Sequence, residues 1–195
     1  MINQAHIIQA ARLDLILLTP AFWEAALRGD QAQTAQFLGV PIPADFWPVS
    51  PYIHTRLEQV RCNQALLPWL GRAMVLRSSL TMVGSIAFHM APEPEPVRPL
   101  GPGGVEFGYT VFPQFRRQGY ATEATLALMT WAQQQGVTRF ILSISPQNQP
   151  SLRLAAHFDF IKIGTQMDEE DGLEEIYERR CGPDFPPVTT CFGSV

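Results

Sequence analysis

Two periods of hydrophobic recurrence alternate along this chain and together predict a mixed α/β protein. Alternating or branched apolar residues predict strands at 12–18, 73–77, 82–88, 105–111, 139–144, 160–164 and 173–179. Apolar residues at helical spacing predict helices at 20–28, 30–38, 52–67 and about 120–135, and a further helix that ends near His157. Strands that alternate with helices favour one sheet flanked by helices.

The order of these elements predicts the topology of the sheet. The strand at 139–144 follows a helix, which makes it a parallel neighbour of the strand at 105–111. The last two strands are predicted to form a hairpin. We therefore expect an α/β (α+β) fold, with a mixed, mostly antiparallel sheet and a central parallel pair. Residues 1–181 are expected to form a single domain, and residues 182–195 a C-terminal extension.

Residues at the element boundaries have the chemistry of helix caps and stops. Thr19 is expected to cap the helix that starts at Pro20, because a hydroxyl can accept from a first-turn amide. Asp30 is expected to cap the next helix in the same way. Gly29 and Gly136 are expected to end the helices that precede them.

Prolines mark three segments as irregular or interrupted. Residues 41–51 contain four prolines and are not expected to form regular structure. Pro68 is expected to interrupt the helix predicted at 52–67. Residues 91–104 contain five prolines and three glycines and are expected to form a loop or flap. A domain linker is not expected here, because the strand that follows belongs to the same sheet.

The composition describes a globular and rather apolar protein. Hydrophobic residues make up 46% of the 195 residues and charged residues 16%, which excludes a disordered chain. The net charge is −4 and Lys162 is the only lysine, so we expect no broad hold on nucleic acid. The chain has neither a long apolar run nor a basic signal region, so a cytoplasmic protein without a membrane partner is expected.

Cysteine usage indicates neither a metal site nor a disulfide framework. The chain has an odd number of cysteines (Cys62, Cys181 and Cys191), and no Cys-x-x-Cys pair occurs. Cys181 and Cys191 are close enough in sequence to pair, but free thiols are the expected state. No metal is expected.

The stretch 105–124 carries the most specific chemistry. A predicted strand ends at Pro113, which has no N–H to donate, and the segment Arg116-Arg117-Gln118-Gly119-Tyr120-Ala121 then opens onto a helix. First-turn amides have no internal partner, and the helix dipole is positive there. Gly119 and Ala121 allow close backbone approach, so the segment predicts a site for a phosphate or pyrophosphate. The spacing is neither that of a Walker loop nor Gly-x-Gly-x-x-Gly, and by itself it also suits a solvated turn.

This segment resembles motif A of the GCN5-related N-acetyltransferases, Gln/Arg-x-x-Gly-x-Gly/Ala. Glu106-Phe107-Gly108-Tyr109, Gly119-Tyr120-Ala121-Thr122-Glu123-Ala124 and Asn148-Gln-Pro-Ser151 resemble, in the same order, the branch that contains ribosomal-protein N-terminal acetyltransferases. The resemblance covers about residues 86–177, and the N-terminal third is similar only in element order. Asp159 stands where the family has a glycine, and Ala155 where many members place a general-acid tyrosine.

The resemblance implies an acetyl-coenzyme A-dependent N-acetyltransferase in which an amine attacks the thioester directly in a ternary complex. The acceptor is a protein N-terminus or a small amine, and a homodimer is left open. Backbone groups of the central strand would pair with the pantetheine arm, and amides before the helix would hold the pyrophosphate. The implied cofactor-binding residues are Tyr109, Thr110, Val111, Arg116, Arg117, Gln118, Gly119, Tyr120, Ala121, Thr122 and Asn148.

Three residues are candidates for the chemistry itself. Glu106 is a carboxylate in a mostly apolar strand, which suits either a general base or a salt bridge at the edge of the core. The resemblance implies Ser151 as a donor to the leaving thiolate, and a helix N-cap is its alternative role. It also implies a catalytic glutamate from the terminal hairpin, Glu170 or its neighbour Glu169, in a run that otherwise reads as a solvated acidic turn.

Other assignments remain open at this stage. His54, His89 and His157 are interpreted as packed or surface residues rather than catalysts. A non-catalytic acyl-coenzyme A-binding module would keep the anion site but lack a base. A nucleotide-phosphate binder would show affinity for ATP and none for coenzyme A.

Overall fold

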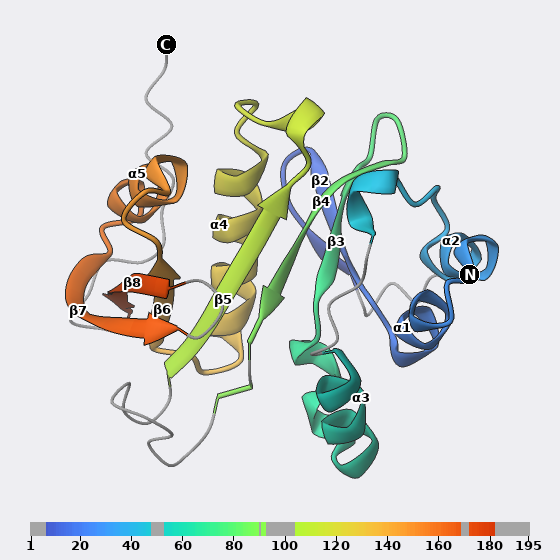
Figure 1. Ribbon diagram of the computed structural model, residues 1–195, viewed down its shortest axis with the longest axis horizontal. Coiled ribbons are helices and arrows are strands. Elements are labelled where there is room, and N and C mark those ends of the chain that lie inside the picture. Colours follow the sequence, from blue (N-terminus) through green and yellow to red (C-terminus); the bar gives the residue numbers. More distant parts are fainter. Residues whose placement is uncertain (1–6, 48–52, 90, 93–103, 169–171, 182–195) are drawn as a thin grey trace. The chain divides into compact units, whose positions relative to one another are not determined.

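The computed structural model of the chain describes residues 7–47, 53–89, 91–92, 104–168 and 172–181 (Figure 1). Its tertiary contacts define two compact units. The first unit comprises Met1–Phe88 and Tyr109–Ala124, and the second comprises His89–Gly108 and Thr125–Val195. Strand β5 (Gly104–Val111) and helix α4 (Tyr120–Gln134) each contribute a part to both units. The expectation of one domain over residues 1–181 stays a prediction.

The first unit is built on an antiparallel run of strands. In sheet order these are β1 (Ile7–Gln9), β2 (Leu13–Leu17), β3 (Arg72–Leu76) and β4 (Thr81–Phe88). Leu15 pairs with Met74 between β2 and β3, and the register between β3 and β4 shifts at Met74/Val75. All but β1 were predicted from the sequence. With three residues, β1 is too short to show a period of its own.

Helices α1 (Pro20–Leu27) and α2 (Gln31–Leu38) begin and end where the sequence predicts. Thr19 Oγ1 accepts from Phe22 N–H at 3.4 Å, and Asp30 Oδ1 accepts from Gln33 N–H at 3.0 Å. Gly39 ends α2 in the left-handed conformation, with φ 77°. Local cap chemistry alone therefore sets these boundaries.

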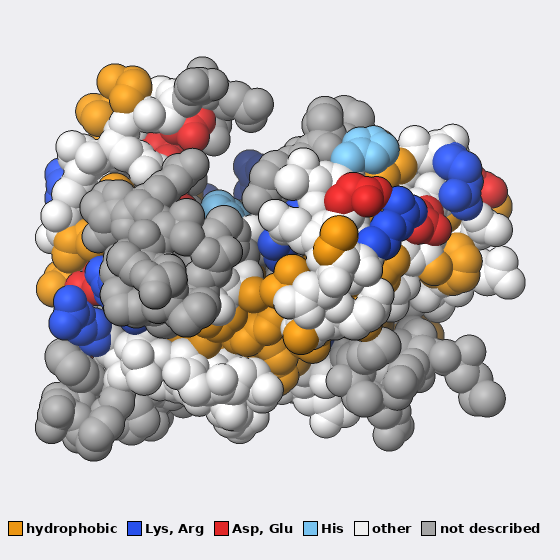
Figure 2. All heavy atoms as spheres, turned by 90° about the horizontal axis from the view of Figure 1, so that it is seen from below, with side chains coloured by type: hydrophobic (Ala, Val, Ile, Leu, Met, Phe, Trp, Pro, Cys, Tyr) orange, Lys and Arg blue, Asp and Glu red, His pale blue; other side chains and the backbone are white. Residues whose placement is uncertain are grey.

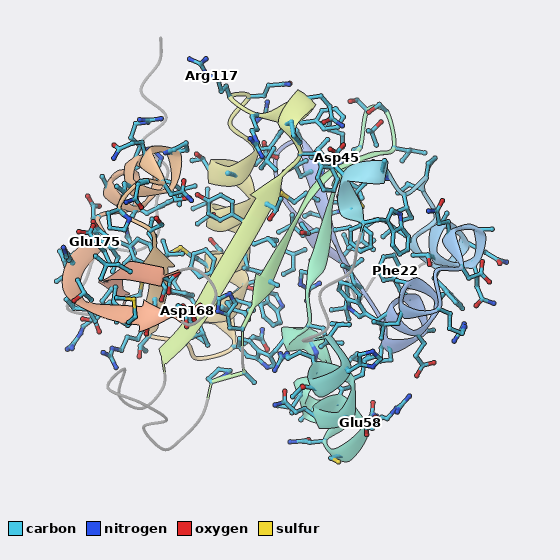
Figure 3. The ribbon with its side chains drawn as sticks, viewed as in Figure 1. Phe22, Asp45, Glu58, Arg117, Asp168 and Glu175 are labelled. Atoms are coloured by element: carbon cyan, nitrogen blue, oxygen red, sulfur yellow. The ribbon has the colours of Figure 1, made fainter. Side chains whose placement is uncertain are left out.

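The core of the first unit lies between these two helices and β2, β3 and β4. Ala26 of α1 and Leu38 of α2 pack against the sheet together with Phe22 of α1, which Figure 3 labels. Phe22 is only 1% exposed. The sheet contributes Ile16, Leu18, Ala73, Val75 and Met82. Burial of these apolar side chains holds the two helices on the sheet.

The segment between α2 and β3 differs from the prediction. The helix predicted at 52–67 is shorter: α3 spans Ile53–Cys62 and is followed by a 3-10 helix, η3 (Gln64–Trp69). Asn63 is extended at φ −143° and its side chain accepts from Ala65 N–H, which ends α3 before Pro68. Pro68 lies inside η3, and a short 3-10 helix, η2 (Ala44–Phe46), interrupts the segment predicted to be irregular.

Charges of both signs cover α3. Arg61 pairs with Glu24 at 2.8 Å and with Glu58 at 2.5 Å, and these hydrogen bonds and charges raise the pKa of Arg61. Figure 2, which views the molecule from below, shows acidic and basic side chains next to each other on this face. Such exposed pairs contribute little to stability.

The second unit contains the parallel pair that the sequence predicts. β6 (Arg139–Ile144) runs parallel to β5, with Val105 opposite Phe140, and antiparallel to β8 (Gly172–Arg180). β7 (Ile161–Asp168) pairs with β8 as the terminal hairpin. The mixed, mostly antiparallel sheet with a central parallel pair is therefore confirmed.

Aromatic packing and a left-handed residue shape the second unit. Phe107 of β5 contacts Phe140 and Phe160, each with ring centroids 6.4 Å apart. Helix α5 (Gln149–His157) is followed by Asp159 at φ 55°. Asp159 thus takes the left-handed conformation expected of the glycine it stands for.

Several expectations concern residues beyond these elements. Cys62 and Cys181 are free thiols, as expected, and Cys191 lies outside the described residues. Residues 93–103 of the proline-rich loop and the tail at 182–195 also lie outside them. In the described part of the chain, no helix has the length and apolarity to cross a membrane.

Candidate active site

The connection between β5 and α4 turns through two left-handed residues. A 3-10 helix, η4 (Pro113–Phe115), follows β5, and Arg117 and Gly119 then have φ values of 61° and 80°. Glycine adopts this conformation without strain. A Cβ at Gly119 would lie 3.4 Å from Arg12 Nη2, so the absent side chain keeps this part of the turn open. We call residues 116–122 the anion loop.

The anion loop ends on the first turn of α4. Glu123 N–H donates to Gly119 O at 3.0 Å, so the N–H groups of residues 120–122 precede the helical hydrogen bonds. The positive end of the helix dipole lies at these amides. Gln118 and Gly119 are exposed. Such an arrangement can hold a phosphate or pyrophosphate group, and that such a group binds here stays a prediction.

The side chains of the anion loop have two different roles. Arg116 Nε donates to Val111 O at 3.0 Å, so this side chain folds back onto the end of β5. Tyr120 is 7% exposed and its hydroxyl donates to Gln118 Oε1 at 3.1 Å. Arg117 is exposed and projects away from the ribbon (Figure 3). Arg117 can therefore reach an anion, whereas Tyr120 can offer mainly its backbone.

The predicted pantetheine-binding segment, Tyr109 to Val111, lies against β4 within the first unit. Val83 O accepts from Phe112 N–H at 3.0 Å, directly after this segment. A Cβ at Gly84 would lie 2.1 Å from Thr110 O, so only glycine allows β4 to approach this closely. Gly84 thereby fixes the course of the backbone whose groups are candidates for binding the arm.

Glu106 and His89 lie side by side in the second unit. His89 N–H donates to Glu106 O at 2.8 Å, and His89 Nδ1 lies 3.6 Å from Glu106 Oε2. A Cβ at Gly108 would lie 3.0 Å from His89 Nε2, so this glycine leaves room for the imidazole. The Glu106 side chain is 22% exposed. Sequence reasoning missed this pairing, because residues 90–105 lie between the two residues in the chain.

Asn148 and Ser151 lie at the start of α5. Asn148 is the N-cap, and its Oδ1 accepts from Ser151 N–H at 3.3 Å. The alternative role of Ser151 as the N-cap is therefore wrong, because Asn148 already occupies that position. Ser151 is partly buried, and Ala155, one turn further on, is fully buried. A side chain at position 155 thus belongs to the core.

Two glutamates of the terminal hairpin are engaged by neighbouring side chains. Glu175 pairs with Lys162 and accepts from the Tyr177 hydroxyl at 2.7 Å, and these two hydrogen bonds lower the pKa of Glu175. The hydrogen bond to Glu175 also raises the pKa of Tyr177. Glu174 accepts from Gln166 Nε2 at 2.9 Å. Glu169 and Glu170 lie outside the described residues. Among the residues that are described, no group of three or more His, Cys, Asp or Glu could hold a metal ion.

Comparisons with known proteins agree with this geometry. The model of the acetyltransferase (GNAT) domain matches residues 12–161. The chain therefore belongs to the GNAT acetyltransferase family, and it is an acetyl-coenzyme A-dependent N-acetyltransferase. A search of curated protein sequences found no match.

Solved structures share the fold. A putative ribosomal-protein-serine acetyltransferase from Vibrio cholerae is 20% identical with a TM-score of 0.56, covering 89% of this chain and 97% of its own. A ribosomal-protein-S5-alanine acetyltransferase from Vibrio fischeri is 13% identical with a TM-score of 0.59, covering 93% and 99%. The microcin C7 self-immunity acetyltransferase MccE, in complex with acetyl-CoA and AMP, is 17% identical with a TM-score of 0.57, covering 87% and 93%.

Proposed function

We propose that this acetyltransferase acts on the α-amino group of a protein or peptide, as a member of the branch that contains ribosomal-protein N-terminal acetyltransferases. The motifs around Glu106, Gly119 and Asn148 support this proposal. So do the solved neighbours that carry ribosomal-protein acetyltransferase names. A small-molecule amine is the alternative acceptor.

The anion loop is proposed to hold the pyrophosphate of acetyl-coenzyme A. The open first-turn amides of α4, the glycine at 119 and the outward Arg117 support this assignment. The remaining loop residues, Arg116, Gln118, Ala121 and Thr122, contribute through backbone groups or by shaping the turn. Backbone groups of Tyr109, Thr110 and Val111 are proposed to pair with the pantetheine arm as an added strand would.

Asn148 and Ser151 are proposed to act at the sulfur end of the arm. The Asn148 Oδ1 is used by the helix cap, which leaves its amide NH₂ to donate to the arm. Ser151 Oγ is proposed to donate to the sulfur as negative charge develops there. Acetyl-coenzyme A itself supplies the acetyl group as an activated thioester.

The single observation that carries the catalytic assignment is the position of Glu106. Its carboxylate is only 22% exposed, lies 3.6 Å from His89 Nδ1 and shares its strand face with a glycine. A carboxylate there can accept the proton that the amine loses on attack, directly or through a water. His89 is proposed to orient that carboxylate. The amine then attacks the thioester carbonyl without a covalent enzyme intermediate.

Glu106→Gln tests this assignment, because it keeps the shape of the side chain but removes its basicity. Turnover with a peptide α-amine should fall by about 10²–10⁴-fold, the usual contribution of general-base catalysis. Calorimetric affinity for coenzyme A should stay close to that of the wild type. The pH profile of turnover should also lose its acidic limb.

Glu170→Gln is the matched control, because the family resemblance makes Glu170 the rival base. If Glu106→Gln keeps near-normal turnover and Glu170→Gln loses most of it, the general base is in the terminal hairpin and not at Glu106. Normal turnover in both variants would leave the amine's own ionisation to supply the reactive form. In either case Glu106 would be only a structural partner of His89.

A further inference from the structure

Arg12, more than 100 residues from the anion loop in sequence, contacts two residues of the loop and the glutamate that follows it. Its Nη2 donates to Gln118 O at 3.0 Å, and its guanidinium lies 4.6 Å above the centre of the Tyr120 ring. Its Nε donates to Glu123 Oε2 at 2.7 Å. All four residues belong to the first unit. One side chain therefore joins the loop, its buried tyrosine and the first turn of α4.

Glu123 forms the other half of this arrangement. Its Oε1 accepts the backbone N–H groups of Arg12 and Leu13, the latter at 2.9 Å. Only 9% of its side chain is exposed, whereas that of Arg12 is 49% exposed. The start of β2 is thus fastened to the N-terminal end of α4 through a nearly buried carboxylate.

The negative charge of Glu123 lies close to the proposed anion site, and Arg12 neutralises it. A carboxylate in the first turn stabilises a helix by itself, because it complements the dipole. The same carboxylate opposes an anion bound at the first-turn amides, because like charges repel. The guanidinium of Arg12 neutralises Glu123 and still leaves the amides of residues 120–122 open.

We propose that Arg12 is a positioning residue for the pyrophosphate site, which fixes the anion loop and cancels the charge of Glu123. This inference rests on the proposed placement of the pyrophosphate at the anion loop. Arg12 acts through Gln118, Tyr120 and Glu123 rather than by touching the reacting atoms. Removing its positive charge therefore weakens coenzyme A binding more than it slows the chemical step.

The test compares charge-keeping and charge-removing variants by calorimetric titration with coenzyme A. Arg12→Gln should raise the Kd about tenfold, because the negative charge of Glu123 in the first turn of α4 then has no cation beside it and repels the bound anion. Arg12→Lys, which keeps the charge, should stay within about threefold of the wild type. The double variant Arg12→Gln/Glu123→Gln should regain most of the lost affinity. A charge effect alone predicts this recovery, because the double variant retains fewer contacts than either single one.

Kinetics and a structural control complete the experiment. For Arg12→Gln the KM for acetyl-coenzyme A should rise in step with Kd, while kcat at saturation stays within about threefold. Arg77→Ala is the matched control: Arg77 donates to Leu13 O and to Ala11 O and pairs with Asp14 at 3.1 Å, so it braces the same segment away from the loop. Its coenzyme A affinity should be unchanged.

Each other outcome has a distinct meaning. If Arg12→Gln/Glu123→Gln binds as weakly as Arg12→Gln, or if Arg77→Ala weakens binding equally, charge neutralisation is wrong and Arg12 only supports the fold. Gly119→Glu places a side chain and a negative charge at the proposed pyrophosphate position, so it should abolish coenzyme A binding. If Arg12→Gln binds coenzyme A normally while Gly119→Glu does not, the inference about Arg12 fails and the pyrophosphate site stands. If Gly119→Glu itself binds normally, the proposed placement of the pyrophosphate fails.

Discussion

The residues proposed for catalysis obtain their roles from what surrounds them rather than from unusual side chains. Glycine at 108 gives His89 its place beside Glu106, and glycine at 119 opens the turn before α4. Asn148, rather than Ser151, is the N-cap of α5. In each case a small or capping neighbour determines what the functional side chain can do.

Ser151→Ala should reveal whether its hydroxyl acts on the leaving thiolate. Loss of one hydrogen bond that strengthens in the transition state should lower kcat about 10- to 100-fold. The Kd for coenzyme A should change by less than about threefold, because the ground-state thioester is a poor acceptor. Steady-state kinetics and calorimetry measure the two effects separately.

Asn148→Asp is the matched control for this prediction, since an aspartate keeps the N-cap acceptor for Ser151 N–H. It should retain the stability of α5 and weaken coenzyme A binding through loss of the amide donor. If Ser151→Ala keeps full turnover and loses thermal stability instead, its hydroxyl is structural.

The turn at Gly119 could be predicted from the sequence, because a turn before a helix depends on neighbouring residues. The N-cap of α5 was considered for Ser151 instead of Asn148, and the binding roles of both residues stay predictions. Arg12 could not be identified, because its contacts with Glu123 join positions 111 residues apart. The pairing of His89 with Glu106 was missed for the same reason, since residues 90–105 separate the two in the chain.

At the scale of elements, β4 and the second half of β5 approach each other closely at Gly84. Gly84→Ala would place a methyl group about where Thr110 O lies, at 2.1 Å, so the backbone must move. We expect the free energy of unfolding to fall by about 1–3 kcal/mol, the usual effect of overpacking. The KM for acetyl-coenzyme A should rise, because Tyr109 to Val111 would shift.

Gly164→Ala provides the control for Gly84→Ala, because Gly164 is also a strand glycine. A Cβ at Gly164 would meet no described heavy atom within 4 Å, and its backbone is not in the left-handed region. Chemical denaturation should show little change for this variant. Equal destabilisation of both variants would mean that strand glycines, rather than the β4–β5 contact, account for the loss.

The elements themselves show where periodicity suffices and where it does not. Thr19, Asp30 and Gly39 set the limits of α1 and α2 because their caps act within one turn. The helix predicted at 52–67 was too long because the helical spacing of apolar residues continues through η3, whereas the extended backbone of Asn63 ends α3. An α-helix and a short 3-10 helix of similar apolar content have similar hydrophobic spacing, so the sequence pattern alone does not distinguish them.

At the scale of the whole chain, the family assignment and the proposed chemistry depend on different sets of residues. The GNAT domain match spans residues 12–161, and hence parts of both units. The residues proposed for the pyrophosphate belong to the first unit, whereas Glu106, Asn148 and Ser151 belong to the second. A non-catalytic coenzyme A-binding module would need the anion loop, the segment Tyr109 to Val111 and Asn148, whereas an acetyltransferase also needs groups such as Glu106 and Ser151 for the chemistry.

Acetyl transfer itself is the measurement that tests this account most directly. The purified protein is incubated with acetyl-coenzyme A and a panel of peptides with free α-amino groups, alongside small amines. Thiol release and the mass of each acceptor are then followed. The account predicts thiol release that depends on a peptide α-amine, matches the acetylated product in amount, and collapses in Glu106→Gln. Tight coenzyme A binding without an acetylated amine anywhere in the panel would contradict it.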